Sequence, residues 1–172
     1  MSIIIALDGH DGVGKTTLAK QLVEQHNGIY VRPFGGKSGI DLIEAADNQY
    51  FDKVSAIGKQ AINEAMLAYI DHTRPLIFDR HWITVLSLLP EHNRICWPHP
   101  IYSFLCSAEL TTIKSRLSKR TSEKQFEDAY HSHYLNTYLK IAKVCGSTVI
   151  ETDHISITGA LQKINEILNT YL

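Results

Sequence analysis

A glycine-rich run near the N-terminus has the residue types and spacing best suited to chemistry. Residues 9–17 read Gly-His-Asp-Gly-Val-Gly-Lys-Thr-Thr and satisfy the pattern G-x-x-x-x-G-K-S/T in full. The glycines let the backbone approach an anion closely, so that consecutive N–H groups can turn toward phosphate oxygens. Lys15 supplies a mobile positive charge, and the Thr16 hydroxyl can ligate Mg²⁺. The run predicts a phosphate-binding loop with the binding residues Gly9, Gly12, Val13, Gly14, Lys15, Thr16 and Thr17.

A carboxylate and a guanidinium end a second apolar run, at residues 75–79. Asp79 could hold a Mg²⁺-bound water or accept a proton from a phosphoryl acceptor, and it joins Thr16 in the predicted metal site. Arg80 could bind a second phosphate or a carboxylate through two parallel hydrogen bonds. The alternative is that the pair only caps the next helix. We favour the chemical role, because in a doubly wound parallel sheet the strand at residues 75–79 would lie beside the strand that precedes the phosphate loop.

Two further basic features could face the same ligand. Arg32 follows an apolar run at residues 28–32 and would project over the same crevice, although a solvated loop arginine is the competing interpretation. Four basic residues fall within residues 114–120, on a predicted helix that leads into a polar segment. Phosphoryl transfer needs positive charge and exclusion of water, which a basic lid would supply. An ordinary solvated helix face explains the same run equally well.

The elements that position these residues alternate along the chain. Short apolar runs at residues 2–8, 28–32, 75–79, 101–106 and 147–151 predict strands that are covered on both faces. Helical periodicity fills the gaps, most clearly after Lys15, over residues 54–69 and over residues 161–171, the last with Ser156 or Thr158 as the N-cap. This pattern predicts an α/β fold with an open, doubly wound, five-stranded parallel sheet. Ligands of such sheets bind beyond the carboxyl ends of the strands.

Composition limits the class of protein. The chain has 172 residues, enough for one domain, and 17 Lys+Arg against 18 Asp+Glu give a net charge of -1. This balance argues against an extended nucleic-acid surface. The N-terminal run is too short for a signal peptide, and no apolar stretch reaches the length of a membrane span. Three cysteines without C-x-x-C spacing are expected to be reduced thiols, and the histidine groupings lack zinc spacing. The predicted location is therefore cytoplasmic, without a membrane partner.

Together these residues resemble the thymidylate kinase family of P-loop nucleoside monophosphate kinases, along almost the whole chain. The phosphate loop with its internal acid is similar to the loop of that family. Asp79-Arg80-His81 matches its Asp-Arg-Tyr/His motif, and Arg32-Pro33 resembles its Arg-Glu-Pro motif without the acid. Arg116, Arg120 and Phe126-Glu127 resemble its lid, and residues 149–172 follow its fifth strand and closing helix.

The resemblance implies a P-loop NTPase fold with three layers and sheet order 2-3-1-4-5. It implies one kinase domain, residues 1–172, with a lid around residues 116–128. ATP with Mg²⁺ would be the phosphoryl donor. The acceptor would be a small nucleotide, namely thymidylate or a related pyrimidine deoxynucleotide, and the protein would assemble as a homodimer. The resemblance also implies that Asp11 would contact the acceptor sugar and that Arg32 and Arg80 would bind the acceptor phosphate. Some members carry a catalytic arginine where this loop has Gly12, so Arg116 or Arg120 of the lid would stabilise the transition state, with Lys15 and Asp79 as the other catalytic residues.

Two alternatives to a monophosphate kinase remain. The family carries an arginine on its third helix that grips the acceptor phosphate, and here the nearest basic residues are Lys53 and Lys59. A kinase that acts on a deoxynucleoside or on the hydroxyl of a modified base is therefore the first alternative. A nucleotide-binding switch without phosphotransferase activity is the second, and it is disfavoured because the chain has no base-reading motif of the Asn-Lys-x-Asp type.

Overall fold

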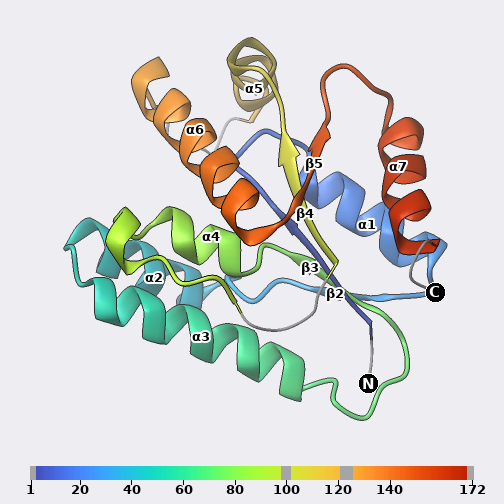
Figure 1. Ribbon diagram of the computed structural model, residues 1–172, viewed down its shortest axis with the longest axis horizontal. Helices are drawn as coiled ribbons and strands as arrows, with labels where there is room; N and C mark the ends of the chain where they lie inside the picture. Colours follow the sequence, from blue (N-terminus) through green and yellow to red (C-terminus); the bar gives the residue numbers. More distant parts are fainter. Residues whose placement is uncertain (1–2, 98–101, 121–125, 170–172) are drawn as a thin grey trace.

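A computed structural model describes residues 3–97, 102–120 and 126–169 of the chain. Its five strands form one parallel sheet in the order β2-β3-β1-β4-β5 (Figure 1). The strands are β1 (Ile4–Asp8), β2 (Ile29–Val31), β3 (Leu76–Asp79), β4 (Tyr102–Ser107) and β5 (Thr148–Glu151). The predicted α/β class and the sheet order implied by the resemblance are confirmed, and each strand begins and ends within two residues of its predicted bounds.

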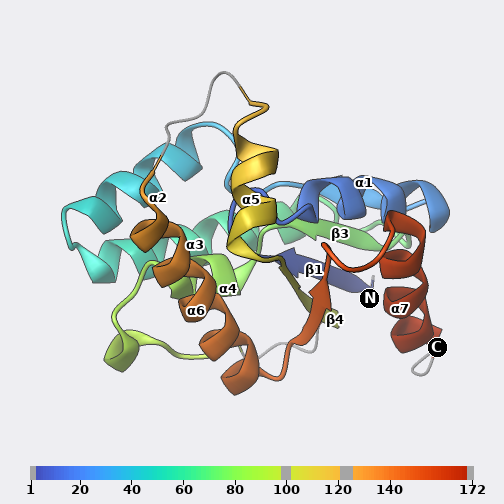
Figure 2. The same ribbon diagram turned by 90° about the horizontal axis from the view of Figure 1, so that it is seen from above.

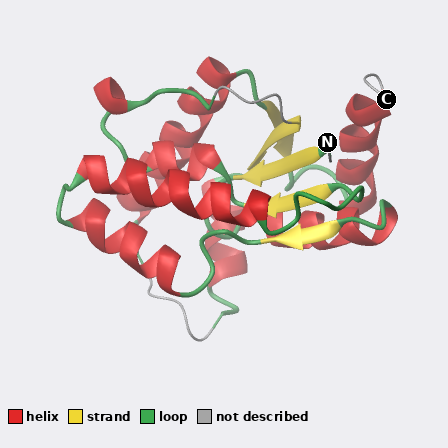
Figure 3. Cartoon of the chain, turned by 90° about the horizontal axis from the view of Figure 1, so that it is seen from below, coloured by secondary structure: helices red, strands yellow, loops and turns green. Residues whose placement is uncertain are grey.

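Helices cover both faces of the sheet and make a three-layer structure. The helices are α1 (Lys15–Gln25), α2 (Lys37–Asp47), α3 (Phe51–Leu67), α4 (Trp82–Ser87), α5 (Leu110–Leu117), α6 (Asp128–Cys145) and α7 (Ile157–Asn169), with a 3₁₀ turn η1 (Glu91–Asn93). α1 and α7 lie on one side of the strands, and α3, α4 and α6 lie on the other, with α2 packed on α3 (Figures 1 and 3). No helix in the described ranges is long and apolar enough to cross a bilayer.

Burial on both faces explains why the central strands read as unbroken apolar runs. The prediction that all five strands are covered on both faces is wrong for the edge strand β5, in which only Ile150 is buried. Ile5 and Leu7 of β1 belong to the core under α1 and α7, which also takes Leu22 and Ile164 from those helices. Ala6, between them, points to the opposite face. Successive side chains of a strand alternate between faces, so a strand covered on both sides must be apolar at every position.

The predicted helices are found, and the structure adds two that the sequence did not indicate. α7 begins after Ser156, whose Oγ accepts a hydrogen bond from the N–H of Gly159 at 3.1 Å, so Ser156 is the cap. α2 begins directly after Gly36 and includes Gly39, in a glycine-rich stretch whose composition is typical of a loop. α6 is the longest helix of the described chain, yet two of its five buried residues are polar, which weakens its periodicity in a hydropathy pattern.

α3 and α4 pack so closely that one glycine has no room for a side chain. A Cβ on Gly58 of α3 would lie 2.6 Å from both γ-methyl carbons of Val85 on α4. The face of α3 that is buried here consists of Val54, Gly58, Ala61 and Ile62, without a charged residue.

Substitution of Gly58 by alanine is therefore expected to lower the free energy of unfolding by about 1–3 kcal/mol, because the added methyl overpacks the contact with Val85. Gly159→Ala in α7 is the matched control, since its Cβ meets only ordinary contacts at 3.5 Å and beyond. There, the better helix propensity of alanine should raise the stability by up to about 1 kcal/mol. Denaturant unfolding of both variants checks the two opposite signs. Equal stability of both variants would contradict the packing described.

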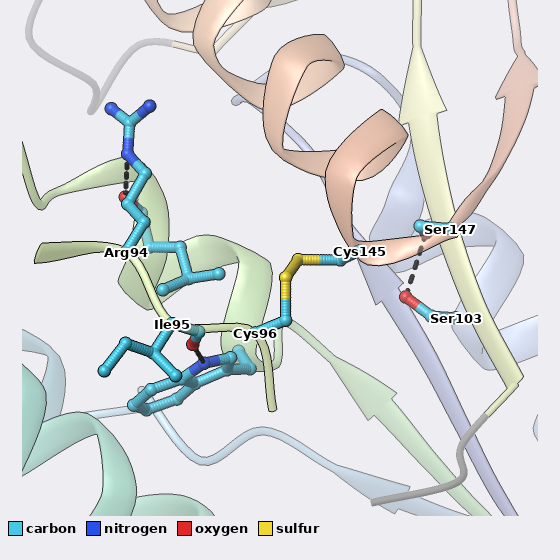
Figure 4. Close-up of a disulfide and its surroundings, with 8 residues drawn as sticks. Arg94, Ile95, Cys96, Ser103, Cys145 and Ser147 are labelled. Carbon is cyan, nitrogen blue, oxygen red and sulfur yellow. Dashed lines mark hydrogen bonds between the residues drawn. A yellow bond between two sulfur atoms is a disulfide. The ribbon is translucent and has the colours of Figure 1, made fainter. Parts of the chain in front are cut away.

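The reduced state expected for all three cysteines is wrong for two of them. Cys96, in the segment after η1, and Cys145, at the end of α6, form a disulfide, and Cys106 is free and buried (Figure 4). Their spacing of 49 residues gave no signal, because only the fold brings their Cα atoms within 5.6 Å. Beside the disulfide, the hydroxyls of Ser103 and Ser147 share a hydrogen bond of 2.9 Å.

The segments that carry the predicted site residues gather at one edge of the sheet, beyond the carboxyl ends of the strands. The glycine-rich loop follows β1, and Arg80 follows β3, the neighbour of β1 in the sheet. α5 stands beyond the carboxyl ends of β4 and β5 (Figure 1), and Figure 2 shows it from above, over this end of the sheet. The predicted binding edge is therefore the edge where the loop, Arg80 and α5 gather.

Candidate active site

The backbone of the glycine-rich loop has the conformation that an anion cradle needs. Gly9, Gly12 and Gly14 have φ values of 143°, 83° and 92°, where side chains are strained. A Cβ on Gly9 would collide with the carbonyl oxygen of Cys106. Gly14 is the N-cap of α1 and no side chain caps this helix, so its first N–H groups and the positive end of its dipole face the loop.

Lys15 is the first residue of α1, and its ammonium group is buried inside the loop. Its Nζ donates a hydrogen bond to the carbonyl oxygen of His10 at 3.2 Å and lies 3.5 Å from Oδ1 of Asp11. Burial, together with the nearby charge of Arg80, lowers the pKa of Lys15 to about 8. At pH 7 the ammonium group is therefore mainly protonated, and residues of the phosphate loop itself hold it in place.

Asp79 is the centre of the polar contacts at the end of β3. Thr16 Oγ1 and Tyr30 Oη both donate hydrogen bonds to its Oδ2, at 2.7 and 2.6 Å. Its Oδ1 is buried and has no hydrogen-bond partner among the described residues. Burial and the bond to Asp79 raise the pKa of Tyr30, so this tyrosine stays a donor. Carboxylate and hydroxyl oxygens are the ligands that Mg²⁺ prefers, so Thr16 and Asp79 fit the predicted metal site.

Arg80 and Asp11 form an ion pair across the crevice, between the turn after β3 and the loop. Arg80 has φ 81°, a strained value for a side chain other than glycine, and its N–H donates to the carbonyl oxygen of Leu7 at 2.9 Å. Burial would raise the pKa of Asp11, but the positive charges of Arg80 and Lys15 outweigh it and lower that pKa to about 2. The pair is therefore charged at neutral pH. The alternative that Arg80 only caps a helix is not supported by these contacts.

Asp8, which the sequence interpretation missed, holds the turn that carries Arg80. Its Oδ1 accepts three hydrogen bonds, from the N–H of His81 at 2.8 Å, the N–H of Thr84 at 2.9 Å and Thr84 Oγ1 at 2.6 Å. It thereby caps α4 from the end of β1. Burial raises the pKa of this carboxyl, which is 1% exposed. An acidic residue at the end of an apolar strand, directly before the glycine loop, was the available signal.

A pocket of about 260 Å³ opens beside the loop. Its walls are Gly12, Gly14, Thr17, Leu18, Arg116, Arg120, Thr152, Ile155, Ser156, Ile157 and Ala160. Arg116 donates to the carbonyl oxygen of Gly12 at 3.2 Å and to Oγ1 and the carbonyl oxygen of Thr152 at 3.0 and 2.8 Å. Its guanidinium is therefore anchored at the wall, where it can stack on a flat ring.

The segment that was expected to be a lid is described only in part. Residues 121–125 lie outside the described residues. Arg120 lines the pocket, and Lys114 forms an ion pair of 2.6 Å with Asp128, from α5 to α6. The structure thus brings both candidate arginines beside the loop, and their role in the transition state stays a prediction.

Arg32 lies at the carboxyl end of β2, the strand that pairs with β3. It comes directly after β2, two residues beyond Tyr30, with an exposed side chain whose charge acts on the hydroxyl of Tyr30. On α3, Lys59 is exposed and Lys53 lies 5.1 Å above the ring of Tyr50. Neither lysine belongs to the buried face of that helix, whereas the charge of Asp79 acts directly on Arg80.

Comparison of the sequence with protein-family models and with curated proteins finds no match. Solved structures do match over nearly the whole chain. One is deoxyadenosine kinase from M. mycoides with dCMP and a flexible dCDP bound, with a TM-score of 0.60, 15% identity and coverage of 99% of this chain and 100% of the kinase. The same kinase with dCTP gives a TM-score of 0.62, at 14% identity, 98% of this chain and 100% of the kinase. The same kinase with dATP gives a TM-score of 0.65, at 14% identity, with coverage of 97% of this chain and 100% of the kinase. At this identity, the likeness shows that the chain has the fold of these P-loop kinases.

Proposed function

We propose that the protein transfers the γ-phosphoryl group of ATP to a nucleoside monophosphate. The observation that carries this proposal is the meeting of Thr16 and Tyr30 on one oxygen of Asp79, next to a buried Lys15 and a complete phosphate loop. Such a site binds phosphates with backbone N–H groups and a lysine, and keeps one carboxylate oxygen for the reaction. A bound Mg²⁺ would neutralise charge on the transferred group.

The residues of the chain divide the work of such a transfer. The N–H groups at the start of α1, with Lys15, bind the donor phosphates. The pocket beside Gly12 and Arg116 takes the adenine ring of ATP. Asp79 faces the acceptor side and either orients the acceptor or receives its proton, and Arg116 or Arg120 supplies positive charge to the transition state. These roles agree with a single kinase domain over residues 1–172 and a lid around residues 116–128.

A monophosphate acceptor is favoured by the cations on the acceptor side. Arg32 is exposed, and Arg80 pairs with the half-exposed carboxylate of Asp11, which an acceptor sugar hydroxyl could engage. A guanidinium matches the geometry of a phosphate, so these arginines suit a 5′-phosphate. Thymidylate or a related pyrimidine deoxynucleotide is the narrower proposal, and a homodimer is the assembly that the family resemblance suggests.

A deoxynucleoside kinase is the second candidate. The buried face of α3 has no cation for an acceptor phosphate, and the three solved structures described above, which share this fold, are of a deoxyadenosine kinase. A nucleoside, or the hydroxyl of a modified base, would need only the Asp79 end of the site.

Substitution of Arg32 by alanine separates these two candidates. If Arg32 binds the acceptor phosphate, the variant should raise KM for monophosphates roughly ten- to a hundredfold and leave KM for nucleosides unchanged. The measurement is ADP release from ATP–Mg²⁺ with each common nucleoside and monophosphate as acceptor. Lys59→Ala on α3 is the control and should change neither value. Equal effects of Arg32→Ala on both acceptor classes would contradict the monophosphate proposal.

A further inference from the structure

Two histidines join the phosphate loop to α6. Nε2 of His10, the second residue of the loop, lies 2.8 Å from Nδ1 of His131 on α6. His10 is 6% exposed and His131 is 4% exposed, although 121 residues separate them in the sequence. Two neutral imidazoles can form this bond, since one ring nitrogen donates and the other accepts. The bond is buried, and it links the phosphate loop to α6, which begins at Asp128.

Aromatic side chains of α6 hold the ring of His10 in place. His10 is stacked on Tyr134 with ring centroids 5.8 Å apart and an interplanar angle of 2°, and it meets His131 edge-on at 5.1 Å. Tyr130 closes the remaining side at 6.0 Å. Burial lowers the pKa of His10 to about 4, so its ring is neutral at pH 7 and can keep the bond. The packing fixes both the position and the protonation state of the ring.

The main chain of His10 connects this contact to the lysine of the loop. Its carbonyl oxygen accepts the hydrogen bond from Lys15 Nζ at 3.2 Å. A residue whose ring is bonded to His131 and whose carbonyl is bonded to Lys15 transmits the position of α6 to the phosphate-binding ammonium. Restraint of the loop before the ligand arrives lowers the entropy lost on binding, which strengthens binding.

We propose that His131 is a positioning residue that, through the ring of His10, fixes the phosphate loop in its binding conformation. The inference rests on the proposed function, because it takes the loop to bind the phosphates of a nucleoside triphosphate. The matched control is available on the same helix, since His133 is exposed and lies two residues away.

The test measures binding of the non-hydrolysable analogue AMP-PNP with Mg²⁺ by titration calorimetry. His131→Ala should weaken binding about five- to tenfold, which is the loss expected for one buried hydrogen bond. His131→Asn should recover most of the affinity, because an asparagine side-chain amide can take the place of Nδ1. His133→Ala should bind as the wild type does. If His131→Ala folds poorly, the comparison between the asparagine variant and the wild type still decides, and a tenfold loss there overturns the proposal.

A double-variant cycle and the imidazole nitrogen resonances provide a readout that a merely structural role would not move. His10→Ala combined with His131→Ala should bind no more weakly than His10→Ala alone, and the Nε2 resonance of His10 should shift in His131→Ala. Additive losses, or an unchanged Nε2 resonance, would overturn the proposal. A wild-type protein that binds no AMP-PNP would defeat the proposed function and this inference together. A wild type and a His131→Ala variant that bind equally would defeat the inference alone.

Discussion

Replacement of Lys15 by alanine is expected to lower kcat for phosphoryl transfer by about a thousandfold. Lys15 is the buried ammonium group inside the loop, and its ion pair with Asp11 can be exchanged for phosphate oxygens when ATP binds, while the carbonyl oxygen of His10 still holds it. The measurement is the initial rate of ADP release at saturating ATP, compared with that of the wild type.

The control for this experiment lies on the same helix. Lys20 of α1 is exposed, so Lys20→Ala should keep the wild-type rate. The pH profile gives a second check, because the pKa of Lys15 is about 8. In the wild type, kcat/KM for ATP should fall as the pH rises through 8 and the ammonium group loses its proton. A Lys15→Ala variant that keeps more than about a tenth of the wild-type rate would refute the assignment of the loop.

The second large effect is expected at Asp79. Asp79→Asn keeps the shape of the side chain, and Thr16 and Tyr30 can still donate to its amide oxygen, but the negative charge is lost. We expect kcat to fall about a hundred- to a thousandfold, while the Kd for AMP-PNP changes much less. The Mg²⁺ concentration that gives half of the maximal rate should also rise, because a charged metal-site oxygen has been removed.

The matched control is Asp71→Asn, at an exposed aspartate in the turn before β3. It should leave kcat, Kd and the Mg²⁺ requirement unchanged. If Asp79→Asn instead weakens AMP-PNP binding by the same factor as it lowers kcat, the carboxylate acts in binding and has no separate role in the transfer. Tyr30→Phe then tells whether the hydrogen bond to Oδ2 contributes to either effect.

Features carried by consecutive residues were predictable from the sequence. The loop, α1 and β1 are specified within residues 4–25, where strand, glycine positions and helix follow one another directly. The apolar runs of β1 and β3 follow from burial on both faces, whereas in the edge strand β5 only Ile150 is buried. Sheet order came from the family resemblance, since periodicity alone does not say which strands are neighbours.

Features that depend on distant pairs were not predictable. Tyr30 meets Asp79 across 49 residues, and His10 meets His131 across 121 residues. A tyrosine in an apolar strand or a histidine on a helix has no local sign of such a partner. α2 was not predictable for a different reason, because Gly35, Gly36 and Gly39 are typical of a loop. Gly39 is nevertheless required in this helix, because a Cβ there would collide with the carbonyl oxygen of Phe34.

The most direct test of the phosphotransferase proposal is transfer of labelled phosphate by the wild-type protein. The protein would be incubated with [γ-³²P]ATP and Mg²⁺, with and without each common nucleoside and nucleoside monophosphate, and the products separated. The proposal predicts label on a nucleoside monophosphate, as a diphosphate product, at a rate that depends on the acceptor and is lost in Lys15→Ala. Label on nucleosides alone would favour the second candidate. Release of free phosphate at the same rate with and without any acceptor would contradict phosphoryl transfer as the function.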